Sequence, residues 1–128
     1  MMLVKVAVGL ILRDDQVFIA LRDSGKHQGG LWEFPGGKCE SGESAELALA
    51  RELEEECGIQ VNACEYFETI AHDYGDKQVE LVFYKVTGFL GEPHGKEGQE
   101  VRWVSLSQLN EFVFPEANVP IVEALLSK

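Results

Sequence analysis

The chain lacks long apolar runs and has few cysteines and histidines. No stretch of 18 apolar residues occurs in its 128 residues, so the sequence predicts no transmembrane helix. Three cysteines are an odd number, and no CxxC spacing is present, which argues against a disulfide framework. Three widely separated histidines argue against a zinc site, and we expect each cysteine to be a small buried side chain.

Basic residues are also scarce, and the beginning of the chain carries no basic leader. Lys and Arg number 11 against 22 Asp and Glu, a formal net charge of −11, so the general surface repels nucleic acid polymers. The first twelve residues are mostly apolar and carry Lys5, and no small-residue cleavage site follows them, which is typical of a strand and not of a signal peptide. We therefore expect a cytoplasmic protein with no membrane and no nucleic acid polymer among its partners.

The distribution of apolar residues predicts one α+β domain spanning residues 1–128, with a mixed sheet and helices packed on it. We expect Pro35 and the pair Gly36 and Gly37 to interrupt regular structure. Trp32 and Trp103 are assigned to packing. The expected strands are 3–12, 17–21, 61–71, 79–87 and 101–104, and the expected helices are 44–57, closed by Gly58, and 118–126, capped by Asn118.

The clearest helix carries a group of acids in its last turns. Glu52, Glu55 and Glu56 stand at positions i, i+3 and i+4, so they share one face. Their repulsion is a few tenths of a kcal/mol per pair, and each opposes the helix macrodipole by roughly 0.3–1 kcal/mol. A divalent cation bound by oxygen ligands, Mg²⁺ or Mn²⁺, would offset both effects. The alternative is a solvated acidic face with Arg51 as its counter-ion.

These acids belong to a longer pattern. Residues 37–59 read as Gly, five residues, Glu, seven residues, then Arg-Glu-apolar-any-Glu-Glu-any-Gly-apolar, and every specified position is filled. The pattern resembles the box of the Nudix hydrolase family. The resemblance implies the Nudix fold, an α/β/α sandwich with a central mixed sheet. It also implies a small metal-dependent enzyme that cleaves a phosphoanhydride bond in a nucleoside diphosphate derivative.

The resemblance also implies roles for the box residues. It implies that Arg51 orients the carboxylates, that Glu43 supports them, and that one of the glutamates is the general base. Mg²⁺ is the implied cofactor, and Mn²⁺ may substitute. The implied metal ligands are Gly36 through its carbonyl, Glu52, Glu55, Glu56 and Glu97, and the implied catalytic residues are Glu52, Glu55, Glu97 and Arg51.

Further segments, at 7–9, 32–38, 91–93, 95–99 and 115–118, are similar to the MutT branch of this family, the 8-oxo-dGTP diphosphatases. Asn118 matches the asparagine that reads the purine edge, where its amide can donate and accept at once. Cytidine-preferring relatives tend to have an acid there. Arg22 matches a residue near phosphate and sugar, and Lys77 and Gln78 fall in a loop whose backbone contacts the base. Phe34 and Val79, with Val4 and Val6, are expected to line the base slot.

Several alternatives remain open. Glu97 is otherwise an exposed loop acid, Asn118 a helix cap and Arg22 a surface arginine. Other substrates of the family are CTP or dCTP, ADP-ribose and dinucleoside polyphosphates. A non-catalytic nucleotide-sensing domain is a third reading, although such domains usually lose box glutamates, which this chain keeps. We expect a monomer whose partner is a small-molecule nucleotide.

Overall fold

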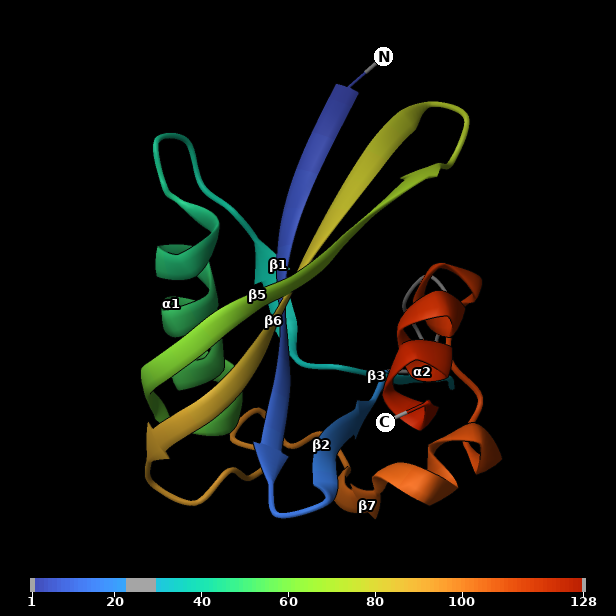
Figure 1. Cartoon of the computed structure of the whole chain (residues 1–128). Helices are drawn as coiled ribbons and strands as arrows, with labels where there is room; N and C mark the ends of the chain where they lie inside the picture. The colour runs from blue at the N-terminus through green and yellow to red at the C-terminus, as the bar shows by residue number, and fades with distance from the viewer. Residues whose placement is uncertain (1, 23–29, 128) are drawn as a thin grey trace.

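A mixed sheet lies between two helices in the computed structural model, which describes residues 2–22 and 30–127 (Figure 1). The strands are β1 (Met2–Arg13), β2 (Gln16–Leu21), β3 (Trp32–Glu33), β4 (Gly36–Lys38), β5 (Gln60–Asp73), β6 (Lys77–Leu90) and β7 (Val101–Ser105). The helices are α1 (Ala45–Cys57) and α2 (Val119–Leu126), with 3₁₀ helices η1 (Leu106–Glu111) and η2 (Glu116–Asn118). No helix in the described ranges is long and apolar enough to cross a membrane.

Strand β1 organises the sheet because it has partners along both edges. It runs parallel to β6 from Met2 to Ile11, and β6 pairs antiparallel with β5. On the other edge, residues 6–8 of β1 pair with β4, while its end forms a hairpin with β2. The hairpin turns at Asp14, whose φ of 57° is left-handed. Strands β3 and β7 then extend the sheet from β2.

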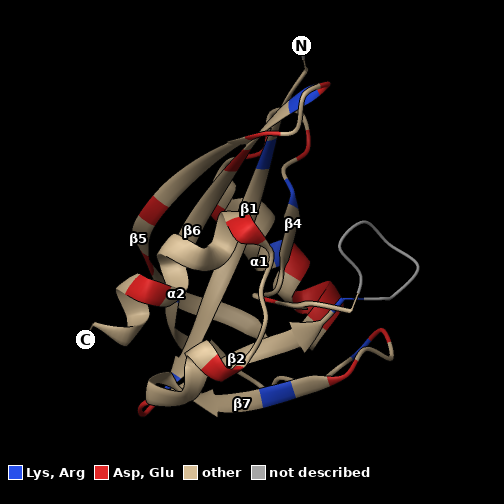
Figure 2. Cartoon of the chain, turned by 90° about the vertical axis from the view of Figure 1, so that its right-hand side faces the viewer, with Lys and Arg blue, Asp and Glu red and all other residues tan. Residues whose placement is uncertain are grey.

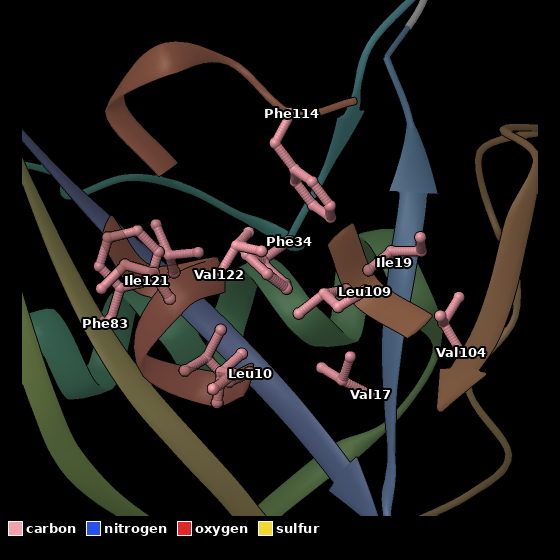
Figure 3. Packing of buried hydrophobic residues seen from close by; sticks show 12 residues of the cluster. Leu10, Val17, Ile19, Phe34, Phe83, Val104, Leu109, Phe114, Ile121 and Val122 are labelled. Carbon is pink, nitrogen blue, oxygen red and sulfur yellow. The ribbon is translucent and has the colours of Figure 1, made fainter. Parts of the chain in front are cut away.

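Alternation along β1 gives the sheet two buried faces. Ala7 and Ile11 belong to the cluster that packs on α1, whereas Val8 and Leu10 belong to the cluster that packs on α2. Figure 3 shows Ile121 of α2 next to side chains of this second cluster. The two helices therefore cover opposite faces, and the predicted α+β sandwich with a mixed sheet is confirmed.

Helix α1 begins and ends as its sequence predicts. The Ser44 hydroxyl accepts from the backbone N–H of Leu47 at 3.2 Å, and Gly58, with φ 72°, donates its N–H to the Glu54 carbonyl. Leu49 and Leu53 are fully buried against the sheet, and each contributes roughly 1.5–3 kcal/mol. The apolar stripe thus fixes which face of α1 points away from the sheet.

Two expectations about local structure are wrong. Gly36 and Gly37 do not interrupt the sheet, because they form β4 and pair with Val8 and Ala7. A Cβ at Gly36 would overlap the Ala7 carbonyl, so the missing side chain is what permits the pairing. Strands β5 and β6 are also longer than predicted, since each continues to the turn at Gly75.

The cysteines fit their prediction only in part. All three are free thiols. Cys57 is buried, and burial raises its pKa to about 12, whereas Cys39 and Cys64 are half-buried. The structure therefore confirms the absence of disulfides and corrects the expected burial of two of the three.

Candidate active site

Two cavities adjoin where β1, β2 and β4 meet the N-terminal end of α2 and the C-terminal end of α1. The first, of about 270 Å³, is here called the apolar cavity, and the second, of about 500 Å³, the acidic cavity. Arg22, Glu33 and Gly36 line both of them. Figure 2 shows acidic segments of α1, in red, beside the end of β2. The loop before β7 contributes to the same cavity. The two cavities therefore lie side by side and share part of their lining.

The apolar cavity is built mainly by two parallel strands. Val4 and Val6 of β1 lie opposite Val79 and Leu81 of β6, so their side chains stand next to one another on one face. Phe34 also lines this cavity, and its ring stacks on Phe114 at 4.9 Å between centroids. The register of the two strands thus produces a flat apolar slot.

Polar groups stand at the rim of this slot. Asn118 lines the cavity and occupies the predicted N-cap position of α2, but its side chain makes no capping hydrogen bond. The reason is local: η2 runs directly into α2 and holds Asn118 in a helical conformation, with φ −92° and ψ −10°. Tyr74 and Lys77 line the same cavity from the β5–β6 turn.

The acidic cavity is lined by Glu56 of α1, Glu33 of β3 and Glu97 of the loop before β7. Burial raises the pKa of Glu56 far above its ordinary value, and a hydrogen bond to Glu52 and the charges of Glu52, Glu33 and Glu97 raise it further. The ionised form of Glu56 is therefore disfavoured here, and a positive charge in the cavity would stabilise the ionised carboxylates.

Arg51 holds one side of this acidic group. It donates from Nε and Nη2 to the two carboxylate oxygens of Glu43, both at 2.9 Å, and from Nη1 to Glu52 at 3.0 Å. This pair holds the pKa of Glu43 at about 2. Nη2 also donates to the Lys38 carbonyl at 3.0 Å, which ties α1 to β4. Arg51 consequently fixes the Glu52 carboxylate against β4.

Gly37 completes that placement. A Cβ at Gly37 would overlap the Glu52 carboxylate in its present position, so the glycine leaves room for the acid there. The side chain of Glu52 is 17% exposed, against 54% for Glu55, whose nearest recorded contact is Arg51 at 3.7 Å. Of the three helix acids, only Glu56 lines the acidic cavity, whereas Glu52 and Glu55 lie outside its lining. Glu52 interacts with Glu56 and is less exposed than Glu55.

The loop between β6 and β7 is fastened to the end of α1. The backbone N–H of Lys96 donates to the Glu56 carbonyl at 3.1 Å, and its Nζ donates to the Glu54 carbonyl at 3.3 Å. The first bond satisfies the Glu56 carbonyl at the helix end, and the second places a cation at the negative end of the helix dipole. The backbone bond also brings the loop that carries Glu97 to the acidic cavity.

The donor set fits a hard divalent cation. Carboxylate oxygens and the backbone carbonyl of Gly36 are the ligand types that Mg²⁺ and Mn²⁺ prefer. Within residues 2–22 and 30–127, no three His, Cys, Asp or Glu side chains converge closely enough to form a complete metal site. The chemistry of these residues nevertheless fits such an ion.

The structure gathers most of the residues that the sequence singled out. Gln78 is an exception, since it is exposed and outside both cavities, and with Lys77 it begins β6 instead of lying in a loop. The predicted site residues Arg51, Glu52 and Glu55 also lie outside the lining of both cavities. Cavity-lining residues among the predicted ones are Val4, Val6, Arg22, Phe34, Gly36, Glu56, Lys77, Val79, Glu97 and Asn118.

Sequence reasoning gave no site role to Glu33, Tyr74 or Gln99, all of which line a cavity. The structure identifies Glu33 as a site residue because its carboxylate forms an ion pair with Arg22, at 2.6 Å, between the two cavities. Its only signal in the sequence is its place between Trp32 and Phe34. Tyr74 carried no signal beyond its position in a turn.

Comparison with known proteins agrees with this geometry. The family profile described as NUDIX domain matches residues 7–124. An 8-oxo-dGTP diphosphatase of Escherichia coli (strain K12) is 42% identical over 94% of this chain and 95% of its own length. A structure from work on MutT of Aliivibrio salmonicida and Vibrio cholerae superposes with a TM-score of 0.88 at 42% identity, covering 98% of each chain.

A third relative has a different printed activity. The CTP pyrophosphohydrolase of Escherichia coli (strain K12) is 33% identical over 99% of this chain and 94% of its own length. The family match and these relatives cover nearly all of the chain, so the chain belongs to the NUDIX domain family. Within that family it is similar to MutT-type 8-oxo-dGTP diphosphatases. Hydrolases of this family generally require a divalent metal ion.

Proposed function

We propose that the chain hydrolyses 8-oxo-dGTP, with one water, to 8-oxo-dGMP and pyrophosphate, and so removes oxidised guanine from the nucleotide pool. The observation that carries the proposal is the adjacency of an apolar slot and an acidic cavity that share Arg22, Glu33 and Gly36. A nucleotide joins a flat base to a chain of phosphates, so neighbouring cavities of these two kinds suit its two ends.

The proposed base site is the apolar cavity. The slot between Val4, Val79 and Phe34 would hold the flat base, and the Asn118 amide would read its edge. An amide can donate to O6 and accept from a protonated N7, which 8-oxoguanine has and guanine lacks. Lys77 lies at the rim of the same cavity, and we propose that it contributes there.

The proposed phosphate site is the acidic cavity together with the outer face of α1. Glu52, Glu55, Glu56, Glu97 and the Gly36 carbonyl would hold Mg²⁺, for which Mn²⁺ may substitute. A bound divalent ion supplies charge neutralisation of the diphosphate and lowers the pKa of water.

The other residues of this site have proposed roles of their own. Arg51 orients Glu52 through the bond at 3.0 Å. A carboxylate, Glu97 or one of Glu52 and Glu55, accepts the proton of the attacking water. Arg22 lies between the cavities, where it would contact the phosphate and sugar.

We further propose that residues 1–128 form one Nudix domain that acts as a cytoplasmic monomer on small-molecule nucleotides. The net charge of −11 supports the exclusion of nucleic acid polymers. Light scattering during gel filtration measures the mass. A value near 14.2 kDa agrees with the monomer, and twice that value contradicts it.

A second candidate function is hydrolysis of another nucleotide, such as CTP or dCTP, ADP-ribose or a dinucleoside polyphosphate. The 33% identity to a CTP pyrophosphohydrolase favours CTP among these. A third is a nucleotide sensor without turnover. The complete set of box glutamates argues against the sensor.

Pyrophosphate release from 8-oxo-dGTP, dGTP, CTP and dCTP, with and without Mg²⁺, separates these functions. We expect Mg²⁺-dependent release with 8-oxo-dGTP far preferred over dGTP. Similar rates on 8-oxo-dGTP and dGTP contradict the selectivity, and faster release from CTP moves the chain to the second candidate. ADP-ribose and dinucleoside polyphosphates are tested for hydrolysis in the same way. Tight nucleotide binding without hydrolysis of any of these compounds would support the sensor.

A further inference from the structure

We propose that Gln99 is a positioning residue that fixes the separation of Glu56 and Glu97 and thereby sets the affinity of the acidic cavity for its divalent cation. The inference rests on the proposed function, because it takes these two carboxylates to be cation ligands. Gln99 lines the acidic cavity and is half-buried, whereas Glu97 is exposed.

The Gln99 amide bridges the two acidic residues through their backbones. Its Nε2 donates to the Glu56 carbonyl at 3.0 Å, and its Oε1 accepts from the Glu97 N–H at 3.0 Å. One partner is only an acceptor and the other only a donor, so a single orientation of the amide satisfies both. Side chains that lack either function cannot make the bridge.

The loop around Gln99 depends on this bridge. Residues 95–98 form a tight turn, with the N–H of Gly98 donating to the Gly95 carbonyl at 2.9 Å and Gly98 at φ 88°. A Cβ at Gly95 would overlap the Gln99 carbonyl, so the turn is folded directly onto Gln99. Glu97 stands at the third position of this turn. The amide therefore holds the backbone of the turn where its acidic side chain projects.

The other end of the bridge lies at the last turn of α1. The Glu56 carbonyl accepts no hydrogen bond from within the helix. It accepts instead from the Lys96 N–H at 3.1 Å and from the Gln99 side-chain amide. Metal sites require ligand positions accurate to about 0.2 Å. Partners that orient ligands without touching the ion typically change metal affinity or activity by about 10–100-fold when removed.

A second anchor of the same loop provides the matched control. Lys96 Nζ donates to the Glu54 carbonyl at 3.3 Å, which fastens the loop to α1 without contacting Glu56 or Glu97 through its side chain. A substitution there loosens the loop and leaves the bridge in place. Gln108, exposed in η1, gives a control for the change of Gln to Met alone.

The test is Mn²⁺ binding to the nucleotide-free protein, measured as free Mn²⁺ by electron paramagnetic resonance. Gln99→Met keeps the length of the side chain and removes both hydrogen bonds, and we expect about 10-fold weaker Mn²⁺ binding. At saturating metal, the KM for nucleotide should stay within about twofold because the apolar cavity is unchanged. Lys96→Met and Gln108→Met should bind Mn²⁺ within about threefold of the original protein. If Gln99→Met does not fold, Gln99→Asn, which is too short for the bridge, takes its place.

A double-mutant cycle separates positioning from a general structural effect. In a Glu97→Ala background, Gln99→Met should have little further effect on Mn²⁺ affinity. A full effect in that background, or unchanged Mn²⁺ binding by Gln99→Met alone, overturns the inference and leaves the proposed function intact. No Mn²⁺ binding by the original protein, with or without nucleotide, overturns both.

Discussion

The apolar and acidic cavities share a wall but are built by different means. The apolar cavity arises from strand register, with Val4 beside Val79 in a parallel pair. The acidic cavity arises from a helix end, a strand end and a loop, which bring Glu56, Glu33 and Glu97 together against their mutual repulsion. Apolar packing stabilises the lining of the apolar cavity. The lining of the acidic cavity is destabilised by repulsion between its acids, and the rest of the fold holds it together. Substitutions in the first should change which base is chosen, and substitutions in the second should change the rate.

The largest effect is expected at Glu56. Glu56→Gln should lower kcat by more than about 100-fold, because loss of a ligand exceeds the 10–100-fold typical of an outer partner. The KM for nucleotide should change much less. Steady-state kinetics with Mg²⁺ measures both, and a kcat within tenfold of the original removes Glu56 from the metal site.

Without metal, Glu56→Gln should be more stable than the original protein, so the residue that serves function lowers stability. The folded protein raises the pKa of Glu56, so the folded state keeps a proton that the unfolded state loses. Metal-free stability therefore falls as pH rises from the ordinary carboxyl pKa of about 4.3 toward the raised value. Glu56→Gln has no carboxyl group to ionise, so its stability does not fall in this way. In thermal unfolding, the difference in Tm between Glu56→Gln and the original protein should grow from pH 5 to pH 8. An advantage that does not grow contradicts the assigned cause.

The next effect is expected at Asn118 in the apolar cavity. Asn118→Ala should lower the preference for 8-oxo-dGTP over dGTP by about 10–100-fold, because a hydrogen bond in a buried site is worth about 1–3 kcal/mol. Cleavage of dGTP itself should be little changed. Asn110→Ala, at an exposed position of η1, is the control. An unchanged ratio of kcat/KM values would remove Asn118 from base reading.

A smaller effect is expected at Glu43, which acts on the acidic cavity through Arg51. Glu43→Gln should lower kcat by about tenfold, as for an outer partner. Its folded pKa of about 2 is below the ordinary value, so its pairing stabilises the fold above about pH 4.3 and is lost as pH falls toward 2. The Tm of Glu43→Gln should therefore be lower at pH 7, with a gap that closes by pH 2.5. A gap independent of pH would show that the pair with Arg51 is not its origin.

The smallest effects are expected at the rim of the apolar cavity. Lys77 lines it and Gln78 does not. Lys77→Gln should raise the KM for 8-oxo-dGTP by about twofold to fivefold, which corresponds to the 0.2–1 kcal/mol of an exposed ionic contact. Gln78→Ala should leave KM unchanged and serves as the matched control. Equal changes in KM at the two positions would contradict the assignment of Lys77, and not Gln78, to the lining of the apolar cavity.

The sequence predicted the fold and the acidic helix better than it predicted the local geometry around them. The helix that carries Glu52 and Glu56 was predictable because Ser44, Gly58 and the apolar stripe are local signals. The pairing of Gly36 with Val8 was not, because glycine disfavours a strand unless a neighbour must approach closely, and that neighbour is distant in sequence.

The same distinction explains the residues that were misjudged. Asn118 fits the pattern of a helix cap, yet the preceding 3₁₀ turn changes its backbone and leaves its side chain at the cavity. Glu33 and Gln99 become site residues only through contacts with Arg22 and with Glu56, which no local pattern encodes. Long-range contacts are therefore the part of the site that the sequence alone does not supply.

The most direct test of the account is a crystal structure with Mn²⁺ and the product 8-oxo-dGMP. The account predicts anomalous density for Mn²⁺ beside Glu52, Glu56 and Glu97, and the base in the slot between β1 and β6 with its edge against the Asn118 amide. Mn²⁺ bound elsewhere, or a base outside that slot, would contradict it.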